Sequence, residues 1–288
     1  KSLSRLVLSE RKLADYVQEQ ILAYSGHDIV AASYFGRPAV LKKFRMLDER
    51  AFADLSEQME HLRGWKHPLI LPPRSIFRDG LFAYVEFEPS PLGSLASWYQ
   101  RQHFLPSDLP PIIRQLLQGL AFLHRQGVSH GHLTPHGVLL FPATESSEAD
   151  GTVIPKLCGL GTNIDKCPVS ADEMSLIAPE VRRSIATGTY APTKRNGPQL
   201  SAHMPADCWG VGICLLMGLC PNYSIPIPAD TVAVLEMPEL EFQAFLPLLK
   251  QMLQIDPLRR PTASALLQHD LLWSQSSMMV LSPSAVAR

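Results

Sequence analysis

The sequence has fewer charged residues than most soluble domains. They make up 18% of its 288 residues, whereas about 25% is usual. The 26 Lys and Arg residues nearly balance the 27 Asp and Glu residues, so the net charge is −1. This balance disfavours nucleic acid or an anionic membrane surface as a partner, because both attract basic proteins. Hydrophobic residues reach 46%, which allows a sizeable core and excludes a wholly disordered chain.

Long apolar runs and paired cysteines are also missing. No run of about 18 apolar residues occurs, so we predict no membrane span, and residues 1–16 contain no apolar signal core. The five cysteines are odd in number and include no CxxC pair. This pattern favours reduced thiols in a cytoplasmic protein over a disulfide-linked scaffold. The chain begins at Lys1 without a methionine, and we expect it to be a piece of a longer protein.

Strand-like and helix-like segments are unevenly distributed. Strand-like runs occupy residues 16–44 and recur at LILPP (69–73) and LFAYVEF (81–87), and one amphipathic helix is expected over 48–66. From residue 91 onward the apolar residues recur at helical spacing. This segregation predicts an α+β fold with two lobes. The expected lobes are a small β-rich N-lobe with one helix (1–88) and a larger helical C-lobe (89–273), followed by a tail or linker (274–288).

Seven short motifs, in one order and at matching spacings, resemble those of the eukaryotic protein kinase domain. They lie at residues 39–42, 67–70, 92–95, 116–140, 178–180, 206–210 and 256–262. The resemblance implies that residues 1–288 form a single domain with the bilobal kinase fold. It also implies that Glu180 and Arg260 form a buried ion pair, and that Asp207 accepts hydrogen bonds from the backbone of the catalytic loop.

The residues that carry out phosphoryl transfer in this family are replaced here. Kinases use an aspartate beside the acceptor hydroxyl, and an asparagine and a second aspartate that hold Mg²⁺. Counted from His130, the first aspartate falls on His132 and the asparagine on Gly137. Counted from Lys156, the second aspartate falls on Gly159. The resemblance therefore places no metal ligand at either magnesium position.

Other phosphate-handling positions are changed as well. Leu22, Tyr24 and His27 stand where the family has the three glycines of the phosphate loop. Gly131 replaces the arginine beside the catalytic aspartate, and Thr134 replaces the phosphate-contacting lysine that follows it. The helix glutamate falls on Gln58, with Glu57 beside it. Lys42 alone matches, at the position of the lysine that contacts the ATP phosphates, and we predict it as a vestigial cofactor-binding residue.

These replacements predict a pseudokinase rather than an enzyme. Removing one preorganised group from an active site costs on the order of 10²–10³ in rate, and several are absent together. We therefore expect no catalytic residue, no metal and no cofactor, and no binding of ATP and Mg²⁺ in the usual way. The expected function is a scaffold or an allosteric regulator that acts on a protein partner or on an adjacent domain of the same polypeptide.

Two other functions of the same fold stay open. One is an inactive switch that still binds nucleotide through Lys42. The other is an atypical, weakly active protein kinase with His132 as general base, because an imidazole titrates near neutrality. A zinc site of His130, His132 and His136 is disfavoured, since no cysteine or carboxylate completes the ligand set.

A long polar stretch at residues 182–203 is expected to be a loop. Its basic residues, Arg182, Arg183, Lys194 and Arg195, make it a candidate surface for an acidic partner. A solvated loop without a partner is the simpler interpretation.

Overall fold

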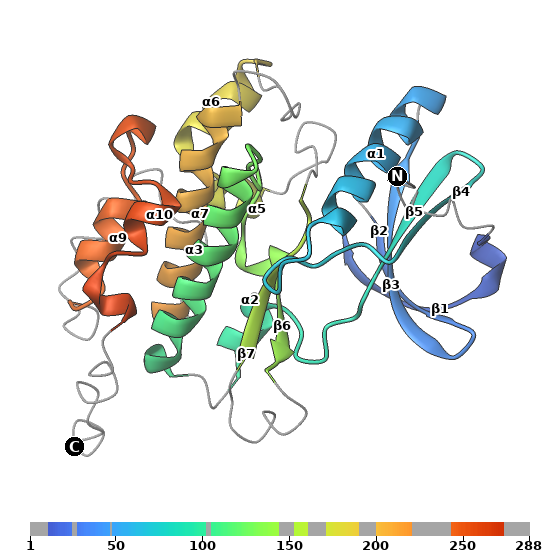
Figure 1. Cartoon of the computed structure of the whole chain (residues 1–288), viewed down its shortest axis with the longest axis horizontal. Coiled ribbons are helices and arrows are strands. Elements are labelled where there is room, and N and C mark those ends of the chain that lie inside the picture. The colour runs from blue at the N-terminus through green and yellow to red at the C-terminus, as the bar shows by residue number, and fades with distance from the viewer. Residues whose placement is uncertain are drawn as a thin grey trace. The chain divides into compact units, whose positions relative to one another are not determined.

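The computed structural model describes residues 11–24, 28–46, 48–101, 105–143, 153–160, 171–189, 200–220 and 243–273. These residues form two compact units that separate between Pro91 and Leu92, three residues after the expected end of the N-lobe at 88. The first unit is rich in strands and the second in helices (Figure 1). This is the α+β architecture that the sequence predicts.

The first unit is built on a five-stranded antiparallel sheet with the strand order β1-β2-β3-β5-β4. Its strands are β1 (Tyr16–Tyr24), β2 (Asp28–Tyr34), β3 (Arg37–Arg45), β4 (Ser75–Asp79) and β5 (Phe82–Phe87). A short 3-10 helix, η1 (Leu13–Asp15), precedes β1. Phe35 and Gly36 connect β2 to β3 with φ angles of 47° and 78°, as a tight hairpin turn requires.

The prediction of a strand over LILPP (69–73) is wrong. The strand of this region is β4, which begins at Ser75, after Pro72 and Pro73. Proline has no backbone N–H and is excluded from the interior of a paired strand. Leu69, Ile70 and Leu71 are all buried, so the apolar run reflects core packing rather than sheet pairing.

The helix of the first unit, α1 (Glu49–Gly64), confirms the helix expected over 48–66. Asp48 caps its start by accepting a hydrogen bond of 2.7 Å from the backbone N–H of Ala51. Leu55, Met59 and Leu62 recur three and four residues apart and are buried, as the amphipathic pattern predicts.

The second unit is mainly helical. Its α-helices are α2 (Leu95–Tyr99), α3 (Leu109–Arg125), α5 (Ala171–Leu176), α6 (Pro179–Ala186), α7 (Leu200–Leu219), α9 (Leu246–Met252) and α10 (Ala263–Leu266), with a two-stranded sheet of β6 (Val138–Pro142) and β7 (Val153–Leu157). The long helices α3 and α7 pack against each other (Figure 1). Tyr99 in α2 adds a cross-link, because its buried hydroxyl donates a 2.6 Å hydrogen bond to the carbonyl oxygen of Cys214 in α7.

The prediction of one long loop over residues 182–203 is wrong at both ends. Arg182 and Arg183 lie in α6, and α7 begins at Leu200. Lys194 and Arg195 lie outside the described residues, as do residues 274–288. In the described part of the chain, no helix has the length and apolar character that crossing a membrane requires.

Candidate functional site

Asp207 of α7 holds the backbone at His130 and Gly131, which lie in the part of residues 116–140 that resembles the kinase catalytic loop. This carboxylate is 1% exposed. It accepts hydrogen bonds from the backbone N–H groups of His130, at 2.7 Å, and Gly131, at 2.8 Å. Its third contact, at 2.9 Å, is with the Nε2 atom of His124 in α3. The clamp confirms the role that the kinase resemblance implies for Asp207, and it fixes the backbone immediately before His132.

His130 links the loop to the end of β7. Its ring is buried, and its Nε2 atom lies 2.9 Å from the carbonyl oxygen of Cys158. Its Nδ1 atom lies 3.4 Å from the backbone nitrogen of His132. The next residue after Cys158 is Gly159, whose φ of 84° lies in the left-handed region. The ring of His130 therefore joins this loop to Cys158, which directly precedes Gly159, the position counted for the second metal-binding aspartate.

Gly137 closes the catalytic loop in η3 (Pro135–Gly137). Its N–H donates to the carbonyl oxygen of Thr134 at 2.9 Å, and its own carbonyl accepts from the N–H of Cys158 at 3.0 Å. A Cβ atom at Gly137 would lie 3.6 Å from the carbonyl oxygen of Cys158, which is ordinary contact. The backbone at this position therefore has room for a Cβ atom, although the sequence supplies none.

The residues at the magnesium positions do not fit the ion that the kinase resemblance implies. Gly137 and Gly159 have no side chain to offer. Across the described residues, no three His, Cys, Asp or Glu side chains gather closely enough to hold a metal ion. The zinc alternative is weakened in the same way, because the ring of His130 is already engaged by Cys158.

Lys42 lies in β3, with its neighbour Val85 directly opposite in β5. The side chain is half-buried, and its ammonium nitrogen is 5.3 Å from the centroid of the Phe44 ring. Gln58 in α1 is half-buried, whereas Glu57 is exposed. The role of Lys42 in nucleotide binding stays a prediction. Of the phosphate-loop positions, His27 lies outside the described residues, as does the side chain of Tyr24, whereas Leu22 in β1 is exposed.

The predicted ion pair between Glu180 and Arg260 is present. The guanidinium donates to both carboxylate oxygens, with distances of 2.6 Å and 3.2 Å. It also donates to the carbonyl oxygen of Gln254 at 2.8 Å and lies 5.3 Å from the centroid of the Trp209 ring. This bidentate pair ties α6 to the segment after α9.

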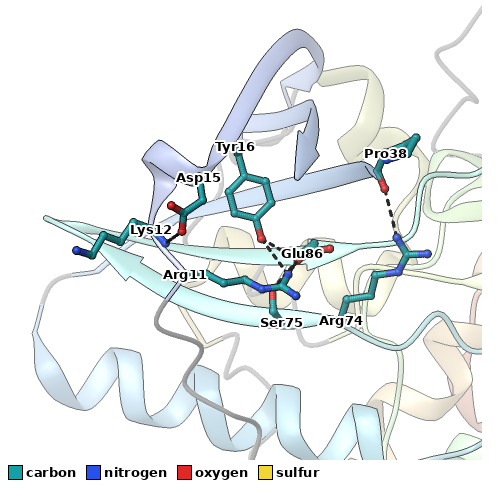
Figure 2. A network of polar contacts seen from close by, with 8 residues as sticks. All are labelled: Arg11, Lys12, Asp15, Tyr16, Pro38, Arg74, Ser75 and Glu86. Carbon is teal, nitrogen blue, oxygen red and sulfur yellow. Dashed lines mark hydrogen bonds and ion pairs between the residues drawn. The ribbon is translucent and has the colours of Figure 1, made fainter. Parts of the chain in front are cut away.

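A buried charge in the first unit was not singled out from the sequence. Glu86 in β5 is 1% exposed and pairs with Arg11, Tyr16 and Ser75 (Figure 2). The sequence feature that indicates this cluster is a glutamate inside the apolar strand LFAYVEF, because a buried charge requires a partner. The partner could not be read from the sequence, because Arg11 lies 75 residues away.

The family model described as the protein kinase domain matches residues 36–272. The chain belongs to the protein kinase domain family. It resembles mitogen-activated protein kinase kinase kinase 1 of Arabidopsis thaliana, with 28% identity over 251 residues, which covers 80% of this chain and 37% of that protein. It also resembles serine/threonine-protein kinase cds1 of Schizosaccharomyces pombe, with 25% identity over 246 residues, or 80% of this chain and 50% of that protein.

A crystal structure of Rad53 residues 1–466 in complex with AMP-PNP has the same fold. The TM-score is 0.65 and the identity 18%, with 90% of this chain and 65% of that chain covered. Both of the curated relatives named above are longer, because this chain spans 37% of the first and 50% of the second.

These relatives contradict the prediction that the chain is not an enzyme. Their names identify them as protein kinases, several of them serine/threonine-protein kinases, and these are enzymes. The prediction rested on the identities of His132, Gly137 and Gly159 at counted positions. The alignment of these positions shows which side chains are replaced. It does not show how much the remaining groups, such as the imidazole of His132, contribute to the reaction rate.

Proposed function

We propose that this domain is an atypical protein kinase of the serine/threonine type with slow phosphoryl transfer. The observation that carries the proposal is the intact clamp of Asp207 on His130 and Gly131, in a chain that belongs to the kinase family. A loop held in this way keeps the residue at the base position, His132, next to a backbone that is fixed within the second unit.

His132 is the proposed proton acceptor. The oxygen of a serine or threonine hydroxyl attacks the γ-phosphorus of ATP, the bond from that phosphorus to the bridging oxygen breaks, and the hydroxyl proton passes to the imidazole. A neutral imidazole suits this role because its ordinary pKa lies near the working pH. Turnover is slow because Gly137 and Gly159 supply no groups that neutralise the phosphate charge.

Lys42 is the proposed phosphate-binding residue. In the Rad53 structure the protein is in complex with AMP-PNP, an ATP analogue, which supports nucleotide binding by a domain of this fold. In this chain the lysine would bind the phosphates without side-chain help at the two magnesium positions. We therefore expect weak nucleotide binding with little dependence on Mg²⁺.

A protein partner or a neighbouring domain completes the proposal. The net charge of −1 gives no support to nucleic acid as the partner. Regulation of that partner is a further proposed function of the same domain, supported by the rigid scaffold around Asp207 and Arg260. A cytoplasmic location is also part of the proposal, and the buried thiols of Cys208 and Cys214 support it. Burial raises the pKa of Cys208 to about 12 and raises the pKa of Cys214 as well.

Replacement of Lys42 tests the proposal. The purified chain with γ-labelled ATP and a serine/threonine peptide mixture is expected to transfer label slowly, and Lys42→Met is expected to lower the rate by about 10²-fold. The matched control is Lys43→Met, because Lys43 is next in β3 and its ammonium lies over the Phe82 ring at 4.2 Å. Transfer by the wild type no faster than by Lys42→Met would overturn the proposal, and so would an equal loss in the control.

A further inference from the structure

Glu86 is the centre of a compact polar cluster on the sheet of the first unit (Figure 2). One carboxylate oxygen, Oε2, accepts hydrogen bonds of 2.7 Å from the hydroxyls of both Tyr16 and Ser75. The same oxygen forms an ion pair with Nη1 of Arg11. Ser75 lies directly opposite Glu86 in the β4–β5 ladder, so two of the three partners are fixed by strands.

Arg11 contacts the cluster through one nitrogen and one aromatic ring. Its Nη1 atom lies 3.1 Å from the hydroxyl oxygen of Tyr16 and 3.2 Å from that of Ser75. Its Cζ atom lies over the ring of Tyr34, 4.2 Å from the ring centroid. The hydrogen bonds at a single nitrogen do not discriminate between cations, whereas the contact with the ring favours a delocalised, weakly hydrated guanidinium over a compact ammonium.

The walls of this cluster are held by packing that does not involve Arg11. Tyr16 stacks on Phe77 with ring centroids 5.3 Å apart, and Phe77 stacks on Tyr84 at the same distance. Tyr16 also contacts Tyr34 at 4.9 Å. These rings belong to one buried hydrophobic cluster, which leaves the acceptor oxygen and the ring face ready for a cation.

The cluster lies on the face of the sheet opposite to Lys42. Leu41 of β3 is paired with Glu86, whereas Lys42 is paired with Val85. Directly opposite residues share a face, and successive residues alternate between faces. The cluster is therefore separate from the proposed phosphate-binding residue.

We propose that Glu86, Ser75, Tyr16 and Tyr34 form a guanidinium-binding site, and that Arg11 of the same chain occupies it as a latch. Occupancy holds the segment that carries Arg11 and η1 against the aromatic face of the sheet. Other ligands of the same class, arginine side chains or small guanidinium ions, compete for the site and release that segment. The hydrogen bond of 2.8 Å from the N–H of Lys12 to the carboxylate of Asp15 closes the turn that directly follows Arg11.

Chemical rescue of Arg11→Ala tests the latch. Loss of the cation leaves Glu86 as a buried charge, and we expect the thermal midpoint of the full chain to fall by on the order of 5–15 °C. Millimolar methylguanidinium is expected to restore part of this loss, whereas methylammonium at the same concentration restores none. Arg78→Ala is the matched control, because Arg78 pairs with Glu49, a carboxylate that is 84% exposed. The control is expected to shift little and to show no rescue.

Two results would overturn the proposal. They are a midpoint in Arg11→Ala that falls no more than in Arg78→Ala, and equal effects of the two cations. If Arg11→Ala does not fold alone, the same comparison is made on its yield of refolding with each cation. In Arg11→Ala/Glu86→Gln, the preference for methylguanidinium is expected to disappear, and its persistence would also contradict the site.

Discussion

The variant His132→Asp/Gly137→Asn/Gly159→Asp is expected to transfer phosphate at least about 10²-fold faster than the wild type, and only with Mg²⁺ present. The new aspartate and asparagine at the two glycine positions supply the oxygen ligands that the ion prefers, and bound Mg²⁺ neutralises the phosphate charge. Label transfer from ATP to a serine/threonine peptide mixture measures the rate.

The two glycine positions differ in what they tolerate. A Cβ atom at Gly137 makes ordinary contact with the carbonyl oxygen of Cys158 at 3.6 Å. Gly159 has a φ of 84°, where any side chain is strained, and aspartate and asparagine enter this left-handed region at a lower cost than most residues. The control is His132→Asp/Gly137→Ala/Gly159→Ala, which adds side chains without oxygen ligands and is expected to show no magnesium-dependent gain. An equal gain in the control would show that metal ligands are not what limits the wild type.

Arg260→Ala is expected to lower the free energy of unfolding by about 3–5 kcal/mol. The side chain of Arg260 is 0% exposed and that of Glu180 is 17% exposed, so truncation leaves the carboxylate without its partner in a poorly solvated place. The same change removes the hydrogen bonds to Gln254 and the contact with the Trp209 ring. Urea unfolding followed by tryptophan fluorescence measures the loss.

The neighbouring arginine provides a close control for this prediction. Arg259 is 79% exposed, and its ion pair with Asp256, which is 50% exposed, spans 3.7 Å. Such surface pairs contribute about 0–1 kcal/mol, so Arg259→Ala is expected to have little effect. Similar losses for Arg259→Ala and Arg260→Ala would contradict the structural role assigned to the buried pair.

The scaffold could be predicted from the sequence wherever a motif fixes both partners. Glu180, Arg260 and Asp207 each belong to a motif of the kinase resemblance, and the structure gives each the contact that the resemblance implies. The helix over 48–66 was also predictable, because Leu55, Met59 and Leu62 repeat at helical spacing and a capping aspartate precedes them.

Other features depend on contacts that no local pattern records. The run LILPP has the composition of a buried strand, yet its two prolines move the start of pairing to Ser75. The basic pair Arg182 and Arg183 looked like part of a polar loop, but it continues α6, which begins at the proline of the preceding motif. The site around Glu86 was missed because it joins β4, β5, β1 and the segment before β1, which are distant in sequence.

The functional conclusion was the least predictable from side-chain identities. His132, Gly137 and Gly159 differ from the family residues, and the prediction drawn from them was that the chain is no enzyme. Membership of the kinase family and relatives named as kinases contradict that prediction. Each substitution in an active site lowers the reaction rate by some factor. The effects of several substitutions are not additive, so the number of replaced residues does not determine whether the reaction still takes place.

Single-turnover phosphate transfer by His132→Ala tests the central claim most directly. We expect His132→Ala to lower the rate by about 10²–10⁴-fold, because the imidazole is the proposed proton acceptor. His136→Ala, which replaces an exposed histidine of the same loop, is the control and should leave the rate unchanged. Equal rates for the wild type and His132→Ala, or no transfer by the wild type, would contradict the account.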